Sequence, residues 1–139
     1  MKGFAVLPMV VFMSLIIGVV VATLAFLGVS EVTQSTKGRD ANYAFLVAQA
    51  GIDDATIRIA RNLNYSNGSG YTLAVENGTS TVIVQKDTFS SPCTAVSATG
   101  KDCIISTGQV KDSKRRIEVV VTIGTYGKVT VDSFKEIAP

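Results

Sequence analysis

The two cysteines are the first residues in this chain that could carry out chemistry. Cys93 and Cys103 are the only cysteines, and they enclose the sequence TAVSATGKD. Their spacing differs from the C-x-x-C of redox and zinc pairs, so a metal or redox role is a poor fit. A disulfide is expected if this part of the chain lies outside the cytoplasm. Closing a loop of this size stabilises a fold by about 3 kcal/mol in the chain-entropy model.

Residues for catalysis are scarce elsewhere in the sequence. The chain has no histidine, which removes the usual acid–base group at neutral pH and the commonest metal ligand. Asp53 and Asp54 are adjacent, so on a helix their side chains would point about 100° apart and would not form a catalytic pair. The sequence has no phosphate-cradling glycine loop. We therefore expect no enzymatic activity, no cofactor and no metal site.

The basic run KDSKRR at residues 111–116 could contact DNA phosphates, or it could be a solvated turn before an edge strand. We expect the turn, because the net charge of +2 is divided evenly along the chain and no part resembles a nucleic-acid-binding tail. Three N-x-S/T sequences could carry glycans or serve as turns, at Asn64, Asn67 and Asn77. DNA and surface ligands remain open as partners.

The N-terminal segment determines where these residues are placed. Residues 4–30 contain no charge, with Lys2 before them and Glu31 after them. About 20 helical residues cross a bilayer core, whereas the apolar core of a cleaved signal peptide has about 7 to 15. The segment is apolar on every face, which disfavours a buried helix of a soluble protein. Lipid or other copies of the chain must cover it, and Lys2 predicts that the N-terminus lies inside and the remainder outside.

Two glycines interrupt this apolar segment, Gly18 and Gly28. Glycine permits close approach of a neighbouring helix or local stretching, at a cost of about 1 kcal/mol in a helix interior. Glycine is also frequent in membrane helices for no special reason. Both interpretations stay open, and the two glycines are candidate assembly positions.

The segment from residue 31 to residue 64 is predicted to be an amphipathic helix. The polar run SEVTQSTKGRD at 30–40 could end the first helix, with Asp40 capping a second one, or the helix could continue unbroken. The turn-rich NYSNGSG at 64–70 should then act as a linker. Apolar residues recur at helical spacing on one side, at Ala41, Phe45, Ala48, Ile52, Ala55, Ile59 and Leu63.

Residues 71–139 alternate in the manner of β-strands. A hairpin is predicted over 71–85 with its turn at Asn77-Gly78, and residues 103–110 could add a strand. A second hairpin turns between Gly124 and Gly127, and it should place Glu118 on the face opposite to its apolar residues. The sequence predicts an α+β fold in which an antiparallel sheet of four or five strands is covered by one helix face. The expected packing residues on that helix are Phe45, Ala48, Ile52, Ala55 and Ile59.

Taken together, these features resemble type IV pilins. A short basic leader at 1–3 ends in glycine, an aromatic residue follows, and then come an apolar helix at 4–30, an amphipathic continuation and a small sheet. Gly3 and Phe4 resemble a prepilin-peptidase site, which implies cleavage after Gly3 and a methylated amine on Phe4. More narrowly, GFAVLPMV and ANYAFLVAQAGIDDATIRIA are similar to PilX-like minor pilins, although Gln49 stands where that pattern has glutamate.

The chain departs from typical major pilins at Pro8. If Phe4 becomes the first residue, Pro8 occupies the fifth position, where major pilins carry a glutamate that meets the N-terminal amine of a neighbouring subunit. Proline is inexpensive there, because the first amides of a helix have no intrahelical partner, but it cannot neutralise an amine. The resemblance therefore favours a minor or priming subunit, or a variant filament.

The resemblance implies a structural subunit that is first held in the inner membrane and then assembled into an extracellular filament on the cell surface, with a role in adhesion or motility. The implied partners are copies of the chain, other pilin subunits, membrane lipid, prepilin peptidase and the inner-membrane assembly machinery. The alternative is an unprocessed, single-span membrane protein that keeps Met1 to Gly3 and presents an outward β-rich binding domain.

Overall fold

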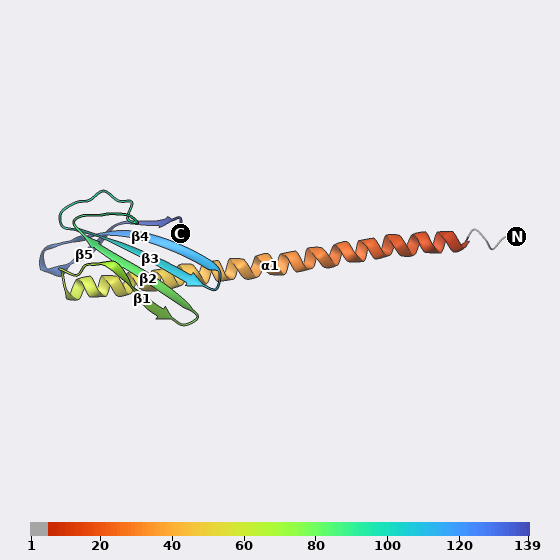
Figure 1. The fold of residues 1–139 in the computed structure, drawn as a ribbon, viewed down its shortest axis with the longest axis horizontal. Coiled ribbons are helices and arrows are strands. Elements are labelled where there is room, and N and C mark those ends of the chain that lie inside the picture. Colours follow the sequence, from red (N-terminus) through yellow and green to blue (C-terminus); the bar gives the residue numbers. More distant parts are fainter. Residues whose placement is uncertain (1–5) are drawn as a thin grey trace. The chain divides into compact units, whose positions relative to one another are not determined.

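The computed structural model describes residues 6–139, so the predicted processing residues Gly3 and Phe4 lie outside the described residues. One helix, α1, spans Val6–Arg61, and five strands follow it (Figure 1). The predicted α+β class is confirmed. The chain divides into a unit that ends at Gly38 and a unit that begins at Arg39, and the two are described separately.

The polar segment around residue 40 is helical, so Asp40 lies inside α1 and caps no second helix. The segment contains no proline, and a single glycine costs a helix only about 1 kcal/mol. The cost of this one glycine is not enough to end a helix whose following turns pack against a sheet.

The sheet is an antiparallel meander in the order β1-β2-β3-β4-β5 (Figure 1). Each strand pairs with its neighbours in sequence, so every connection is a turn or a short loop. A short 3-10 turn, Thr125–Gly127, joins the last two strands. The strands are β1 Asn67–Val75, β2 Gly78–Lys86, β3 Lys101–Val110, β4 Ser113–Ile123 and β5 Val129–Ile137.

The first hairpin differs from the prediction at both of its ends. Strand β1 begins at Asn67, inside the segment expected to be a linker, and its register is irregular between Asn67 and Tyr71. Gly70 has a φ of 79° at this bulge, a conformation that glycine adopts at little cost. The two-residue loop is formed by Glu76 and Asn77, since Gly78 already pairs with Val75. The predicted Asn77-Gly78 turn is therefore wrong by one residue.

Packing explains this shift of the turn. A Cβ atom on Gly78 would lie 2.7 Å from the carbonyl oxygen of Gln109 and 3.0 Å from a methyl group of Val47. Gly78 thus provides space for neighbouring segments, and the positive φ of this loop falls on Glu76 at 45°. The glycine marks a close approach rather than the turn itself.

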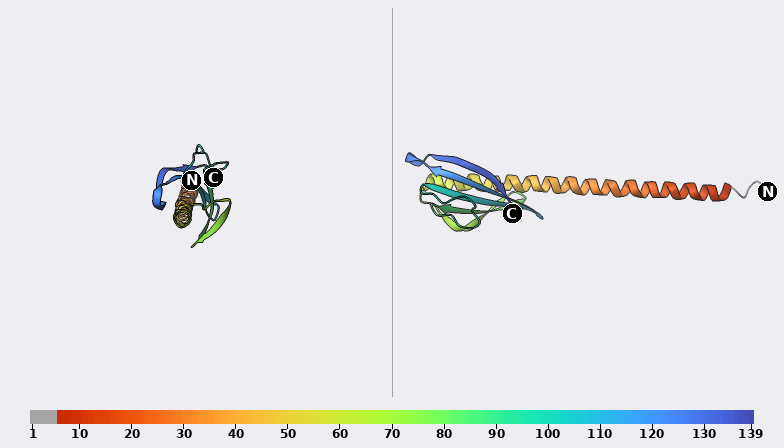
Figure 2. Two further views of the ribbon diagram at one scale, coloured as in Figure 1. Left: turned by 90° about the vertical axis from the view of Figure 1, so that its left-hand side faces the viewer. Right: turned by 90° about the horizontal axis from the view of Figure 1, so that it is seen from above.

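The core lies between the sheet and the part of α1 that follows Arg39. Seen end-on, the sheet curves around this helix, with β1 and β5 on its two sides (Figure 2). Phe45 packs against the core from the β5 side, where its ring meets that of Phe134 edge to face at a centroid distance of 6.5 Å. The buried residues of the main cluster are Ala48, Ile52, Ala55, Ile59, Val82, Val84, Ile104, Ile117, Val119 and Val121.

The buried face of the helix is wider than the predicted stripe. Ala44 and Val47 form a second buried cluster with Val110, although neither residue lies on the stripe. Leu63, the last residue of the stripe, follows the end of α1 and is 39% exposed. A curved sheet contacts more than one row of helix side chains, which a single stripe does not represent.

Small residues let the helix approach the sheet closely. A Cβ atom on Gly51 would overlap the hydroxyl groups of Ser80 and Ser106, which are buried and hydrogen-bonded to each other at 2.7 Å. A Cβ atom on Gly108 would overlap the backbone of Ala44 and Ala48. Backbone contacts of this kind leave no room for a side chain, so these positions fix the distance between helix and sheet.

Candidate assembly surface

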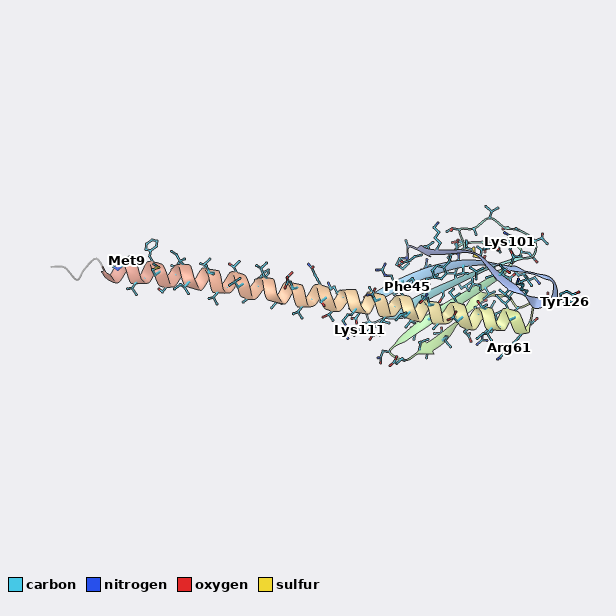
Figure 3. The ribbon with its side chains drawn as sticks, turned by 180° about the vertical axis from the view of Figure 1, so that it is seen from behind. Met9, Phe45, Arg61, Lys101, Lys111 and Tyr126 are labelled. Atoms are coloured by element: carbon cyan, nitrogen blue, oxygen red, sulfur yellow. A yellow bond between two sulfur atoms is a disulfide. The ribbon has the colours of Figure 1, made fainter. Side chains whose placement is uncertain are left out.

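The first unit presents an apolar surface on every side of α1 (Figure 3). Met9, Phe12 and Phe26 are 65%, 72% and 80% exposed, and large apolar side chains between them are exposed to a similar extent. This part of α1 is long and apolar enough to cross a membrane, and none of its apolar stretch is buried within the chain. We name residues 8–32 of α1 the apolar helix surface. By itself, such a helix is compatible with membrane insertion or with a secretion signal.

The polar groups of the apolar helix surface are largely satisfied by the helix itself. Ser14 donates a hydrogen bond to the carbonyl oxygen of Val11 at 2.9 Å, and Thr23 donates to that of Val19 at 2.8 Å. A hydroxyl bonded within its own helix can enter an apolar environment without losing a partner. The surface is therefore suited to lipid or to other helices as its surroundings.

Three of the predicted assembly positions, Pro8, Gly18 and Gly28, lie on this surface, and the fourth, Phe4, lies outside the described residues. Pro8 is exposed near the beginning of α1. A Cβ atom on Gly18 or Gly28 would meet no atom within 4 Å, so neither glycine is required by contacts within the chain. Their role in close helix packing stays a prediction that concerns neighbouring molecules.

A groove of about 560 Å³ adjoins α1 in the second unit. It lies between the helix, the β1–β2 loop and the β3–β4 turn, and it is lined by Tyr43 and Leu46, which are 51% and 55% exposed. Lys111, labelled in Figure 3, closes one side through an ion pair with Asp40 at 2.9 Å. Exposed apolar residues beside a charged rim are typical of a contact surface.

The adjacent aspartates of the helix have separate environments. Asp53 is exposed, whereas Asp54 accepts hydrogen bonds from the Tyr71 hydroxyl at 2.6 Å and from Arg58 at 2.7 Å. Burial opposes ionisation of Asp54, but these two bonds outweigh it and lower the pKa of the carboxyl. Arg58 also lies 4.4 Å from the centre of the Tyr71 ring. The cluster joins β1 to the helix.

Cys93 and Cys103 form a disulfide that ties the loop at 87–100 to β3. Glu118 holds the same loop, because its carboxylate accepts hydrogen bonds from the Thr94 amide at 2.6 Å and from the Thr94 hydroxyl at 2.9 Å. The two sulfur atoms and this carboxylate lie within 4.8 Å of one another. With the sulfur atoms bonded to each other, no thiolate is present to bind a metal ion.

The burial of Glu118 was not expected from the sequence. Glu118 lies on the sheet face away from α1, as the alternation predicts, but only 4% of it is exposed because the disulfide-bonded loop covers it. Its single signal in the sequence is its position in the apolar strand Ile117–Ile123, between residues that all prove to be largely buried.

The basic run contributes to an interior strand. Residues 113–116 begin β4, which pairs with β3 on one side and β5 on the other, so the expectation of an edge strand is wrong. Lys111 lies in the turn with a φ of 50°. Strand β4 is not an edge strand because β5 follows it in the chain and pairs with it. The edge strands of the sheet are β1 and β5.

Asp102 is a second buried carboxylate, and no pattern in the sequence indicated its burial. It is 0% exposed, and neither of its oxygens has a hydrogen-bond partner in the described part of the chain. Burial raises the pKa of this carboxyl to about 6, although Lys86 opposes the shift. Because the pKa in the native state exceeds the usual 3.8, the folded chain binds more protons than the unfolded chain between these two values.

Stability should therefore fall as the pH rises from about 4 to above 6, by on the order of 2 kcal/mol from Asp102 alone. We expect Asp102→Asn, which cannot ionise, to remove most of this fall in the urea unfolding midpoint of the full chain in detergent micelles. Asp53→Asn is the control, because it removes an exposed carboxylate from α1. An unchanged pH profile in Asp102→Asn would show that this group is not the source.

No known protein family, curated protein or solved structure matches this chain. Its class therefore follows from its architecture alone. A long N-terminal helix with an apolar first part is packed through its second part on a five-stranded antiparallel sheet, and this architecture is pilin-like.

Proposed function

We propose that the chain is a structural subunit of an extracellular filament of the type IV pilus kind. In this proposal, residues 4–30 hold it in the inner membrane, processing occurs after Gly3, and the apolar helix surface then becomes the filament core. The proposal assigns it no enzymatic activity. Its partners are copies of itself or other pilin subunits, together with prepilin peptidase and the assembly machinery.

The observation that carries this proposal is the exposure of apolar side chains around the full circumference of α1 before residue 33. The second unit has a closed core of its own and needs no cover from these side chains. Lipid tails and neighbouring apolar helices are similar environments for them, so transfer from membrane to filament has a small net cost. The groove beside Tyr43 and Leu46 would provide a further contact between subunits.

Within this class, the sequence favours a minor or priming subunit similar to PilX-like proteins. Pro8 lacks the carboxylate with which typical major pilins meet the amine of a neighbouring subunit. A subunit with proline at this position suits a place in the filament where it has no neighbouring N-terminal amine to neutralise. The proposal does not depend on this narrower assignment.

Filament assembly can be tested by blocking the predicted processing. We expect Gly3→Leu to keep the chain in the membrane fraction and to reduce its amount in the sheared surface fraction by about tenfold or more, because the leader would remain on the helix. Immunoblotting of both fractions from the native cells provides the measurement. Gly68→Ala is the control, because a Cβ atom there meets no atom within 4 Å.

A permanent membrane anchor is the alternative, since a helix of this length and composition would serve it equally well. In that case the wild-type chain itself would be absent from the sheared fraction, and Gly3→Leu would change nothing. That pair of results would reject the filament proposal.

A further inference from the structure

The sheet face that points away from α1 holds a groove of about 480 Å³ on β2, β3 and β4, which we name the outer-face groove. Side chains alternate between the two faces of a sheet. Ser80 and Gly108 face α1, so their neighbours in sequence face outward. The pairing register then places two rows of side chains across the groove, Thr79–Gln109–Lys114 and Thr81–Thr107–Arg116.

The remaining lining of the outer-face groove is apolar. Ile83 and Ile105 are paired and form the next row along the strands, and Ile105 is only 2% exposed. Pro92, from the disulfide-bonded loop, and Pro139 also line the groove. The groove therefore combines an apolar patch with a polar patch on one surface.

The polar patch is positively charged. In the described part of the chain, Lys114 and Arg116 form no ion pair with an acidic side chain, and no acidic side chain lines the groove. Arg116 uses its Nε to donate to the Thr107 hydroxyl at 3.0 Å and one Nη to donate to the Ala138 carbonyl at 3.4 Å. Its other N–H groups remain for a ligand, since a guanidinium has five.

The hydroxyl groups extend this donor surface. Thr79 and Thr81 are exposed on β2 and make no side-chain hydrogen bond in residues 6–139. Thr72 of β1 pairs with Thr81, which continues one row of threonines across three strands to Arg116. A hydroxyl can donate and accept, so the rows can bind a polyhydroxylated ligand beside a charged one.

We propose that the outer-face groove binds an acidic saccharide. The carboxylate, sulfate or phosphate of the sugar would lie against Lys114 and Arg116, its hydroxyl groups against Thr79, Thr81 and Gln109, and its C–H face against the half-buried Ile83 and Pro92. Charge-assisted bonds to guanidinium supply the strongest contacts. This assignment is independent of filament assembly, because every lining residue belongs to the second unit.

A nucleic acid fits this groove less well. Proteins that bind single strands stack bases on aromatic side chains, and the lining contains no aromatic residue. Non-specific affinity for a duplex comes from cationic side chains that neutralise many phosphates, whereas only two cationic side chains line the groove. Mixed hydroxyl, amide and apolar lining matches a sugar more closely.

The test uses the isotope-labelled full chain in micelles of an uncharged detergent, with digalacturonate as the probe. We expect saturable shifts of backbone amide resonances in β2, β3 and β4, with a Kd of about 1 mM or below. The doubly substituted Lys114→Gln/Arg116→Gln chain should bind about tenfold or more weakly, and Thr81→Val about threefold more weakly.

The matched control is Arg115→Gln, which removes the same charge from the same strand. Arg115 pairs with Gly108, faces the α1 side and contacts Glu136 at 2.8 Å, so its loss should change the Kd less than about twofold. Cellobiose, which is uncharged, should produce no saturable shifts.

Several results would overturn the assignment. Absence of saturable shifts with digalacturonate would reject the site, and equal losses in Arg115→Gln and in the double variant would show attraction by the general charge of the chain. Inorganic phosphate that binds as tightly as digalacturonate would reduce the groove to a simple anion site. A short oligothymidylate that binds through Lys114 and Arg116 while digalacturonate does not would replace the saccharide with a nucleic acid.

Discussion

Replacing Gly108 with alanine should destabilise the second unit by about 3 kcal/mol or more, the largest effect that we expect from a single added methyl group. A Cβ atom at this position would lie 2.5 Å from the amide nitrogen of Ala48 and closer still to the carbonyl oxygen of Ala44. Both are backbone atoms of α1, so no side-chain rotation relieves the overlap. The helix would have to move away from β3 and leave the buried cluster less tightly packed.

The urea unfolding midpoint of the full chain in detergent micelles provides the measurement for Gly108→Ala. Gly68→Ala is the matched control, because it adds the same methyl group to another strand where no atom lies within 4 Å. The free energy of unfolding of Gly68→Ala should differ from that of the wild type by less than about 0.5 kcal/mol. If both variants unfolded at the midpoint of the wild type, the close approach of α1 and β3 would be disproved.

Removing the disulfide should have the second large effect. We expect Cys93→Ala/Cys103→Ala to lower the free energy of unfolding by about 3 kcal/mol, chiefly because the unfolded chain regains the freedom that the closed loop denies it. Cys103 is fully buried, so the loss of its sulfur atom also weakens packing beneath the loop. The hydrogen bonds from Thr94 to Glu118 remain, so the loop at 87–100 should loosen without unfolding the sheet.

Two measurements distinguish this result from a general effect of substitution. Urea unfolding gives the change in stability, and limited proteolysis should show new cleavage between residues 87 and 100. Val96→Ala, in the same loop and 88% exposed, should leave both unchanged. Chemical reduction of the wild type should reproduce the variant. A reduced wild type with an unshifted midpoint would contradict the stabilising role of the disulfide.

The sequence was sufficient to predict the elements of the fold, because each depends on a periodic pattern that extends over many residues. The helical spacing from Phe45 to Ile59 and the alternation from Ile117 to Ile123 both reflect burial against a single partner surface. Such patterns tolerate one or two exceptions. They therefore predict an α+β fold well and predict its exact boundaries poorly.

Boundaries and loops depend on contacts that have no local signal. Asn77-Gly78 has the composition of a two-residue turn, yet the space needed by Gln109, Val110 and Val47 places Gly78 inside β2. Residues of β3 and α1, which are distant from Gly78 in the sequence, decided the position of that turn. A pattern read along the chain cannot contain this information.

The polar residues of the sheet were the hardest to place. Asp102 and Glu118 are both buried: Asp102 lies on the same face of β3 as Ile104, which packs on α1, and Glu118 lies under the disulfide-bonded loop. The outer-face groove likewise arises from the register of three strands, which brings Thr81, Thr107 and Arg116 into one row. Which residues lie side by side across the strands cannot be predicted until the register of the strands is known.

The most direct test of the filament account is the intact mass of the chain recovered from the sheared surface fraction of its native cells. A processed filament subunit should lack Met1 to Gly3 and begin at Phe4, with one methyl group on the new amine. Its mass should rise by about 2 Da on reduction of the disulfide. A surface chain that retains Met1 to Gly3, or a chain found only in membranes at its full mass, would contradict the filament proposal.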